Sequence, residues 1–154
     1  MIIEKVKLVA VVCCLAFIGS LLVNAAEMKD TRTMVNLPEP IKGKMLVNMR
    51  DHIHALDDII HAVRAGEYEK AQGIADSRLG WSSFEGSGDK ELAGYWPKPM
   101  QVMADQMYKA GSNFVVLAQN ASVEENAENY MNLIGALGEV TSACRGCHQA
   151  YRLR

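Results

Sequence analysis

The chain contains one highly specific short motif, Cys144-Arg145-Gly146-Cys147-His148, and the expected fold follows from its position. In a Cys-x-x-Cys-His motif the two thiols add across the vinyl groups of a haem, and the adjacent imidazole binds the haem iron. On a helix the three side chains stand at i, i+3 and i+4, so they project from one side. We therefore expect one covalent haem c, attached through Cys144 and Cys147, with His148 as an axial ligand of the iron.

Three other interpretations of the two cysteines are a structural zinc half-site, a redox-active dithiol and a plain disulfide. A structural zinc site needs four ligands, yet the chain after residue 25 has no second cysteine pair, only His52, His54 and His61. A thioredoxin-like dithiol needs a βαβ setting, and no strand-like alternation lies near the motif. A disulfide would suit an oxidising compartment. The haem interpretation is preferred because the motif is specific for it.

Residues 1–25 have the pattern of a secretory signal peptide. Lys5 and Lys7 precede a mostly apolar stretch from Leu8 to Val23, and small residues precede Ala26, as signal cleavage requires. The apolar stretch is short for a membrane span, so an uncleaved anchor is the alternative. We therefore expect a periplasmic protein whose domain covers residues 26–154 and which has no stable membrane span after cleavage.

The charge of the chain is mildly acidic. The formal net charge is −2 and becomes −3 when Glu4, Lys5 and Lys7 are removed with residues 1–25. No basic stripe is present, so nucleic acid is not an expected partner. An acidic surface favours encounters with basic patches on other proteins. No Ser/His/Asp or paired-carboxylate constellation is present, so we expect no enzymatic activity.

Four helices are expected from apolar residues at helical spacing. They cover residues 40–65, 67–79, 99–119 and a last segment that begins at the capping box Ser122/Glu125 and carries the motif. Residues 26–36 are expected to form a loose leader, and residues 80–98 an irregular segment that packs over one end of the core. Four amphipathic helices favour an all-α fold, an antiparallel four-helix bundle with the haem between helices near the C-terminus of the last one.

The apolar faces of all four helices supply the expected core. In chain order their members are Met45, Met49, His52, Ile53, Leu56, Ile60 and Val63; then Tyr68, Ala71, Ala75 and Leu79; then Met100, Met103, Met107, Gly111, Phe114 and Ala118; then Ala127, Tyr130, Ile134, Leu137, Thr141, Cys144 and His148. His54 and His61 lie on the polar face of the first helix with Asp57 between them. We expect a solvated surface there rather than a metal site.

With this motif on the last of four helices, the sequence resembles the class II c-type cytochromes, the cytochrome c′ family. Members carry Cys-x-x-Cys-His followed three and four residues later by an aromatic and a basic residue, as Tyr151 and Arg152 follow His148 here. The resemblance implies haem c and iron as cofactors and a helical bundle. It also implies that a homodimer can form through the first two helices, although the charged outward face of residues 50–64 argues against a large apolar interface.

Within the family the sixth iron position is either open, for binding small gases, or filled by a methionine of the first helix in low-spin electron carriers. Counted back from Gly66, the family's distal position falls at Arg50, which points off the apolar face, whereas Met49 points into it. We therefore expect Met49 to be the sixth ligand, with Met45 and then His52 as substitutes. An open site walled by Met49 is the alternative.

The expected function is transfer of single electrons between redox partner proteins, because methionine opposite histidine keeps the iron six-coordinate. The alternative is a five-coordinate cytochrome c′ that binds nitric oxide or carbon monoxide, and a third hypothesis is a subunit or sensor module that docks through residues 80–98. Arg145 and Arg152 either pair with the haem propionates or lie exposed near a helix C-terminus, where cations are favoured. Trp81 and Trp96 are expected to anchor the core or its covering loop.

Overall fold

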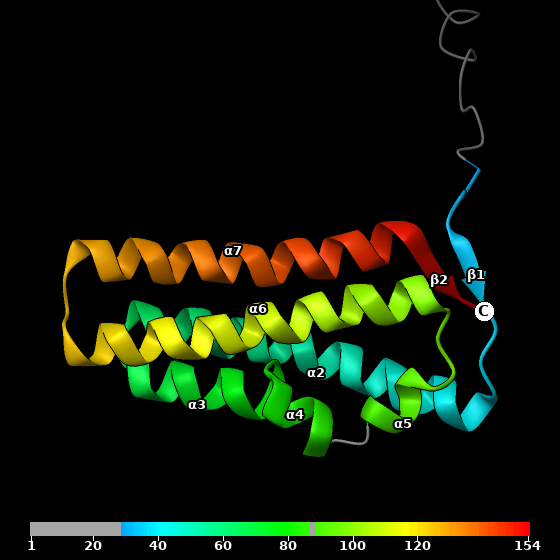
Figure 1. The fold of residues 1–154 in the computed structure, drawn as a ribbon, viewed down its shortest axis with the longest axis horizontal. Coiled ribbons are helices and arrows are strands. Elements are labelled where there is room, and N and C mark those ends of the chain that lie inside the picture. The colour runs from blue at the N-terminus through cyan, green and yellow to red at the C-terminus, as the bar shows by residue number, and fades with distance from the viewer. Residues whose placement is uncertain (1–28, 87–88) are drawn as a thin grey trace, which may run out of the picture. The chain divides into compact units, whose positions relative to one another are not determined.

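The computed structural model describes residues 29–86 and 89–154 (Figure 1). The chain divides into residues 1–31 and a compact unit of residues 32–154, and the description below concerns the second unit. The expected signal peptide, residues 1–25, lies outside the described residues. Helices make up 79% of the described residues, which confirms the expected all-α class. None of the helices in these two ranges is long and apolar enough to span a membrane.

Within the described ranges the helices differ greatly in length. The long ones are α2 (Glu39–Arg64), α6 (Lys98–Val123) and α7 (Ala127–Ala150), and the short ones are α3 (Tyr68–Arg78), α4 (Trp81–Gly86) and α5 (Asp89–Ala93) (Figure 1). Two strands of three residues, β1 (Thr33–Val35) and β2 (Tyr151–Leu153), flank the helical part of the chain.

The bounds of α2 come from local signals at both ends. Pro40 stands in its first turn, where the missing backbone N–H of proline removes no helical hydrogen bond. At the other end Gly66 has a φ of 74°, a left-handed conformation that glycine adopts without steric penalty. The Glu67 N–H then donates to the Ala62 carbonyl at 2.9 Å. The expected helix over residues 40–65 is therefore confirmed within one residue at each end.

Three expectations about local structure are wrong. Residues 33–35 of the expected leader form β1, in which Val35 is buried. The segment 80–98 is not irregular, because it contains α4 and α5. Its expected packing against the core is confirmed, because Leu92 and Trp96 are buried. The capping box at Ser122 is not used: α6 continues through Val123, and α7 begins after Asn126, whose side chain accepts a hydrogen bond from the Asn129 N–H at 2.8 Å.

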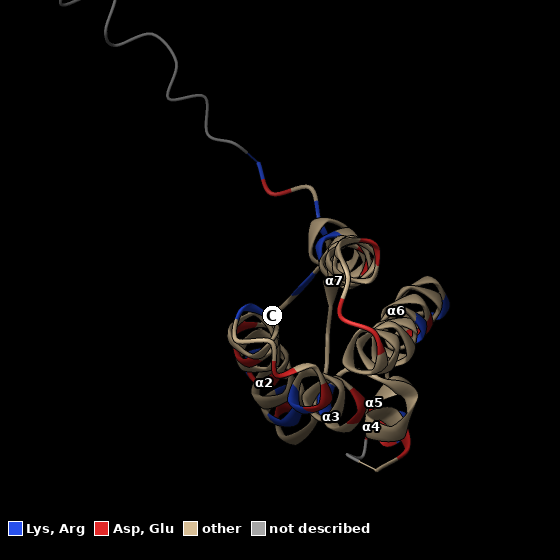
Figure 2. Ribbon diagram, turned by 90° about the vertical axis from the view of Figure 1, so that its left-hand side faces the viewer, with Lys and Arg blue, Asp and Glu red and all other residues tan. Residues whose placement is uncertain are grey.

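The helices pack in sequence order, with α2 against α3, α3 against α6 and α6 against α7. Seen nearly along their axes in Figure 2, these four lie around a common centre, and consecutive ones run in opposite directions (Figure 1). The larger core cluster is made of small and aliphatic side chains with one phenylalanine: Ala55, Ile59, Ala62, Val63, Ala71, Ala75, Leu79, Phe114, Ala118, Ala121, Leu133, Ala136 and Val140. The small side chains in this cluster let the helices approach one another closely.

The buried faces of α2 and α7 are rotated from the expected ones. On α2, Ile53 is 62% and Ile60 51% exposed, while Ala55 and Ile59 are fully buried. On α7, Ile134 is exposed and its neighbour Leu133 is buried. In both helices an apolar flank lies beside the buried face, so apolar spacing alone did not identify the face that packs.

The strands β1 and β2 pair in parallel, with Thr33 opposite Tyr151 and Val35 opposite Leu153. This pair joins the segment before α2 to the segment directly after α7. A second core cluster lies at the same end of the unit: Val35, Ile41, Met45, Leu92, Trp96 and Met100, with Met49, Cys147 and Tyr151 packed against it. The motif residues therefore lie where the strand pair joins the segment before α2 to the segment after α7.

Candidate functional site

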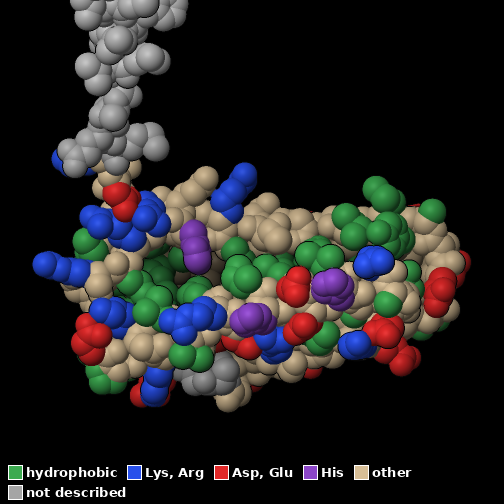
Figure 3. All heavy atoms as spheres, turned by 180° about the vertical axis from the view of Figure 1, so that it is seen from behind, with side chains coloured by type: hydrophobic (Ala, Val, Ile, Leu, Met, Phe, Trp, Pro, Cys, Tyr) green, Lys and Arg blue, Asp and Glu red, His purple; other side chains and the backbone are tan. Residues whose placement is uncertain are grey.

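An apolar cleft lies between α2, α6 and α7 at the end of the unit that carries the strands. It is lined by Met45, Met49, His52, Trp96, Met100, Met103, Ala104, Met107, Tyr108, Ala143, Cys144, Cys147 and His148. The cavity within the cleft is about 50 Å³, well below the ~300–1,000 Å³ typical of small-molecule sites, so the side chains of its wall would have to move apart to admit a large group. Figure 3 shows the hollow at the left, lined by hydrophobic side chains.

The two cysteines of the motif both line this cleft. Cys144 and Cys147 are half-buried, and both thiols are free. Burial raises the pKa of each thiol above its usual range, and for Cys147 the nearby Cys144 adds to the effect. Both groups are therefore protonated at neutral pH, which slows thiolate chemistry such as disulfide formation. Two reduced thiols on one wall of an apolar cleft fit attachment of a large planar apolar group.

His148 also lines the cleft and keeps an exposed side chain at its edge. Its backbone carbonyl accepts a hydrogen bond from Arg32 Nη1 at 3.4 Å. Arg145, the remaining candidate from the motif, is exposed and is not among the residues that line the cleft. The structure thus brings Cys144, Cys147 and His148 together and leaves Arg145 outside.

Met49 reaches the same cleft from α2 and is half-buried there, with Met45 on the preceding turn almost fully buried. The other methionines of the wall, Met100, Met103 and Met107, come from α6. The sequence places these three on one helical face but does not show that they share a cleft with the motif. Methionine side chains are flexible and polarisable, so they fit closely around an irregular or planar ligand.

A buried polar cluster stands behind the cleft wall. The Asp89 carboxylate of α5 is 3% exposed and accepts hydrogen bonds from the Tyr108 hydroxyl at 2.7 Å and from the Asn48 side-chain amide. Burial, with the hydrogen bond to Asp89, raises the pKa of Tyr108. Burial lowers the pKa of His52, although the Asp89 and Asp51 charges act in the opposite direction. His52 is thus a neutral imidazole at neutral pH, and no pattern in the sequence relates Asp89 to it.

One polar atom of the cleft lining supplies an independent sign of a ligand. Trp96 is 93% buried, since 7% of it is exposed, and its Nε1 has no hydrogen-bond partner among the described residues. A buried donor without a partner costs about 1–3 kcal/mol. An acceptor on a group that fills the cleft would remove this penalty. The residue types of the lining therefore fit a haem, with thiols, an imidazole, a thioether and an apolar wall in one place, although the cavity between them is too small to hold one unless the side chains move apart.

Two wider hollows on the surface lack these features. One is lined by residues of α6 and α7 around Asn113 and Glu139, and the other lies around Gly66 and Ser122. Neither contains a cysteine, a histidine or a methionine. Within residues 29–86 and 89–154, no group of three or more His, Cys, Asp and Glu side chains lies close enough to hold a metal ion.

The expected solvated face around His54 and His61 is observed. His61 Nε2 lies 3.8 Å from an Asp57 oxygen, and both side chains are about 70% exposed, at 67% and 71%. An exposed pair of this kind contributes little to stability.

Comparisons with known proteins identify no relative: no family model matches the chain, and neither the curated proteins nor the solved structures give a match.

Proposed function

We propose that this chain is an exported, periplasmic, monohaem c-type cytochrome that carries single electrons between redox partner proteins. Its fold would be an antiparallel four-helix bundle of the cytochrome c′ kind, formed by α2, α3, α6 and α7. The observation that supports the proposal is the single apolar cleft lined by Cys144, Cys147 and His148 from α7 and by Met49 from α2. Two thiols for covalent attachment, an imidazole and a thioether would thereby be available to one group.

The residues of the cleft have separate roles in this proposal. Cys144 and Cys147 would hold the haem covalently, and His148 of α7 would offer its imidazole to the iron. Met49 of α2 would offer its thioether. When bound, the haem supplies an iron centre that changes its oxidation state by one electron. The apolar wall keeps water away and so raises the reduction potential, while the exposed edge of His148 gives partners a short approach.

Covalent attachment is the first test. Protein purified from a periplasm that matures c-type cytochromes should keep its haem after denaturation, with an intact mass increased by one haem. Cys144→Ala and Cys147→Ala should each leave one thioether bond, and the double variant should retain no haem. Intact mass without haem in the unaltered protein would refute the proposed function.

The optical spectrum, with and without carbon monoxide, tests the sixth ligand. We expect a low-spin six-coordinate spectrum that carbon monoxide does not change. Met49→Ala should convert it to a high-spin spectrum that responds to the gas. Met103→Ala is the matched control, because Met103 is also half-buried in the cleft but comes from α6, and it should leave the spin state unchanged. A high-spin, gas-responsive spectrum in the unaltered protein would instead favour the gas-binding function.

A further inference from the structure

Three arginines stand next in the chain to residues that line the cleft or donate a hydrogen bond to one of them. Arg50 follows Met49 on α2, and Arg145 follows Cys144 on α7. Arg32, directly before β1, donates to the carbonyl of His148. Figure 3 shows Lys and Arg side chains around the hollow. We call Arg32, Arg50 and Arg145 the basic rim.

Acidic side chains near the cleft are engaged with groups other than Arg50 and Arg145. The Asp51 carboxylate is held by Arg78, with oxygen–nitrogen distances of 2.6 and 3.0 Å, and Asp105 pairs with Lys109 at 2.7 Å. Asp89 is buried behind the wall. Among the ion pairs between described residues, none involves Arg50 or Arg145, and both side chains are exposed.

The opposite end of the helices has the opposite charge. The connection between α6 and α7 and the first turn of α7 carry three exposed carboxylates, Glu124, Glu125 and Glu128, and the start of α3 carries Glu67 and Glu69. Figure 2, viewed from this end, shows the α6–α7 connection in the colour of acidic residues. A chain with a net charge of −2 therefore presents a positive end at the cleft. Net charge alone predicted partners with basic patches, and the distribution of charge reverses that prediction for this face.

We infer that the basic rim is the docking surface for an acidic patch on a partner protein. This inference rests on the proposed function, because a redox partner must approach the exposed edge of the cleft. The apolar side chains Leu46 and Ile53, 38% and 62% exposed, lie beside Arg50 on α2. A small apolar area with charged residues around it suits a transient protein interface. A nucleic acid would need a longer basic track than three arginines.

The test measures binding of a fluorescent oligoglutamate peptide to the full protein by anisotropy at low salt. Arg50→Glu and Arg145→Glu should each weaken binding by about threefold or more, because reversing a charge near the bound peptide removes an attraction and adds a repulsion. Arg64→Glu is the matched control: Arg64 is exposed in the last turn of α2 and makes the same change in net charge far from the cleft. It should change binding much less.

The outcomes of this titration test the docking surface independently of haem attachment. Binding that falls with salt and with the rim variants, but not with Arg64→Glu, supports the inference. Equal weakening by all three variants would show a dependence on net charge alone and overturn it. Tighter binding of anionic lipid vesicles than of the peptide would overturn it in favour of a membrane surface. The peptide titration does not require haem, so a protein without haem that still binds through the rim would refute the proposed function and leave the docking surface standing.

Discussion

The close approach of α6 to the end of α3 gives a sharp prediction, because it depends on the absence of one side chain. Gly111 lies inside α6, and a Cβ built at this residue would come within 2.2 Å of the Leu79 carbonyl oxygen and 2.6 Å of the Leu79 carbonyl carbon. Contacts under 3.0 Å are essentially not observed for real Cβ atoms, so Gly111→Ala would require the Leu79 oxygen to move by at least 0.8 Å.

The obstruction is backbone, which cannot turn away as a side chain can. Leu79 and Gly80 both donate to the Ala75 carbonyl at 2.8 Å, so displacing this segment also distorts the end of α3. Overpacking of this kind costs about 1–3 kcal/mol or more. The alanine would return about 1 kcal/mol through its higher helix propensity. We expect a net loss of about 2 kcal/mol in the free energy of unfolding, at the upper end of these costs.

The matched control is Gly138→Ala in α7, where an added Cβ meets nothing within 4 Å. This substitution should stabilise the protein by about 0.5–1 kcal/mol. Urea unfolding followed by far-ultraviolet circular dichroism measures both variants. If Gly111→Ala were as stable as the unaltered protein, or more so, α6 and α3 would not approach as closely as described, and the position of the α6 methionines in the cleft would be in doubt.

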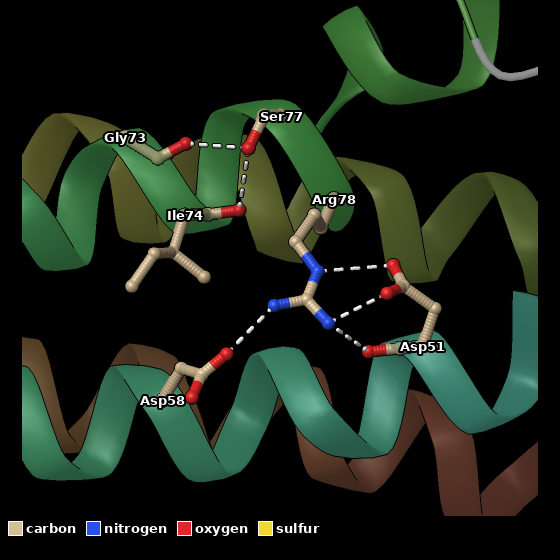
Figure 4. A network of polar contacts seen from close by, with 6 residues as sticks. All are labelled: Asp51, Asp58, Gly73, Ile74, Ser77 and Arg78. Atoms are coloured by element: carbon tan, nitrogen blue, oxygen red, sulfur yellow. Dashed lines mark hydrogen bonds and ion pairs between the residues drawn. The ribbon is translucent and has the colours of Figure 1, made fainter.

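Three further substitutions test polar contacts around the same helices. Arg78→Met removes hydrogen bonds to Asp51 and Asp58 (Figure 4). It should lower the free energy of unfolding by about 1–2 kcal/mol, less than the loss of a buried network would, because the carboxylates are half-exposed. Since Arg78 lowers the pKa of Asp51, urea unfolding should show this loss of stability at pH values above the carboxyl's usual pKa and no loss after acidification. Tyr108→Phe leaves the buried Asp89 carboxylate with one donor fewer and should lower the urea midpoint by the equivalent of about 1–3 kcal/mol; an unchanged midpoint would contradict the burial of that bond. Burial lowers the pKa of His52 below its usual 6.5, so the unfolded chain takes up this proton first and stability should fall as pH drops below 6.5, a slope that His52→Gln should reduce.

The parts of the fold that the sequence predicted are those with local causes. Pro40 and Gly66 act within one or two residues, through a missing N–H and a left-handed φ, and the bounds of α2 follow from them. Where two local signals compete, the sequence does not choose between them. Ser122 and Asn126 are both good capping residues, and in the structure α6 continues through Val123 while Asn126 caps α7.

The candidate site was predictable from the motif on the α7 side, and on the α2 side the family resemblance pointed to Met49, Met45 and His52, which all line the cleft. Cys144, Cys147 and His148 form a contiguous motif whose chemistry follows from residue type and spacing. The opposite wall depends on how α2 and α6 pack, which is a property of three helices together. Trp96 and Tyr108 reach the cleft through that packing, and no spacing in the sequence relates either of them to the motif.

The parallel pairing of β1 with β2 has a consequence for the order in which the molecule assembles. Thr33 and Tyr151 are partners across 118 positions of sequence, since 151 minus 33 is 118. A contact between residues so distant in the chain forms slowly, because its loop-closure entropy must be offset by structure already in place. We therefore expect the helices to come together before the strands meet, and the end of the molecule that carries Cys144 and Cys147 to close last. If the proposed function is right, the haem would be attached most easily in that interval, while Cys144 and Cys147 are more accessible than in the complete fold.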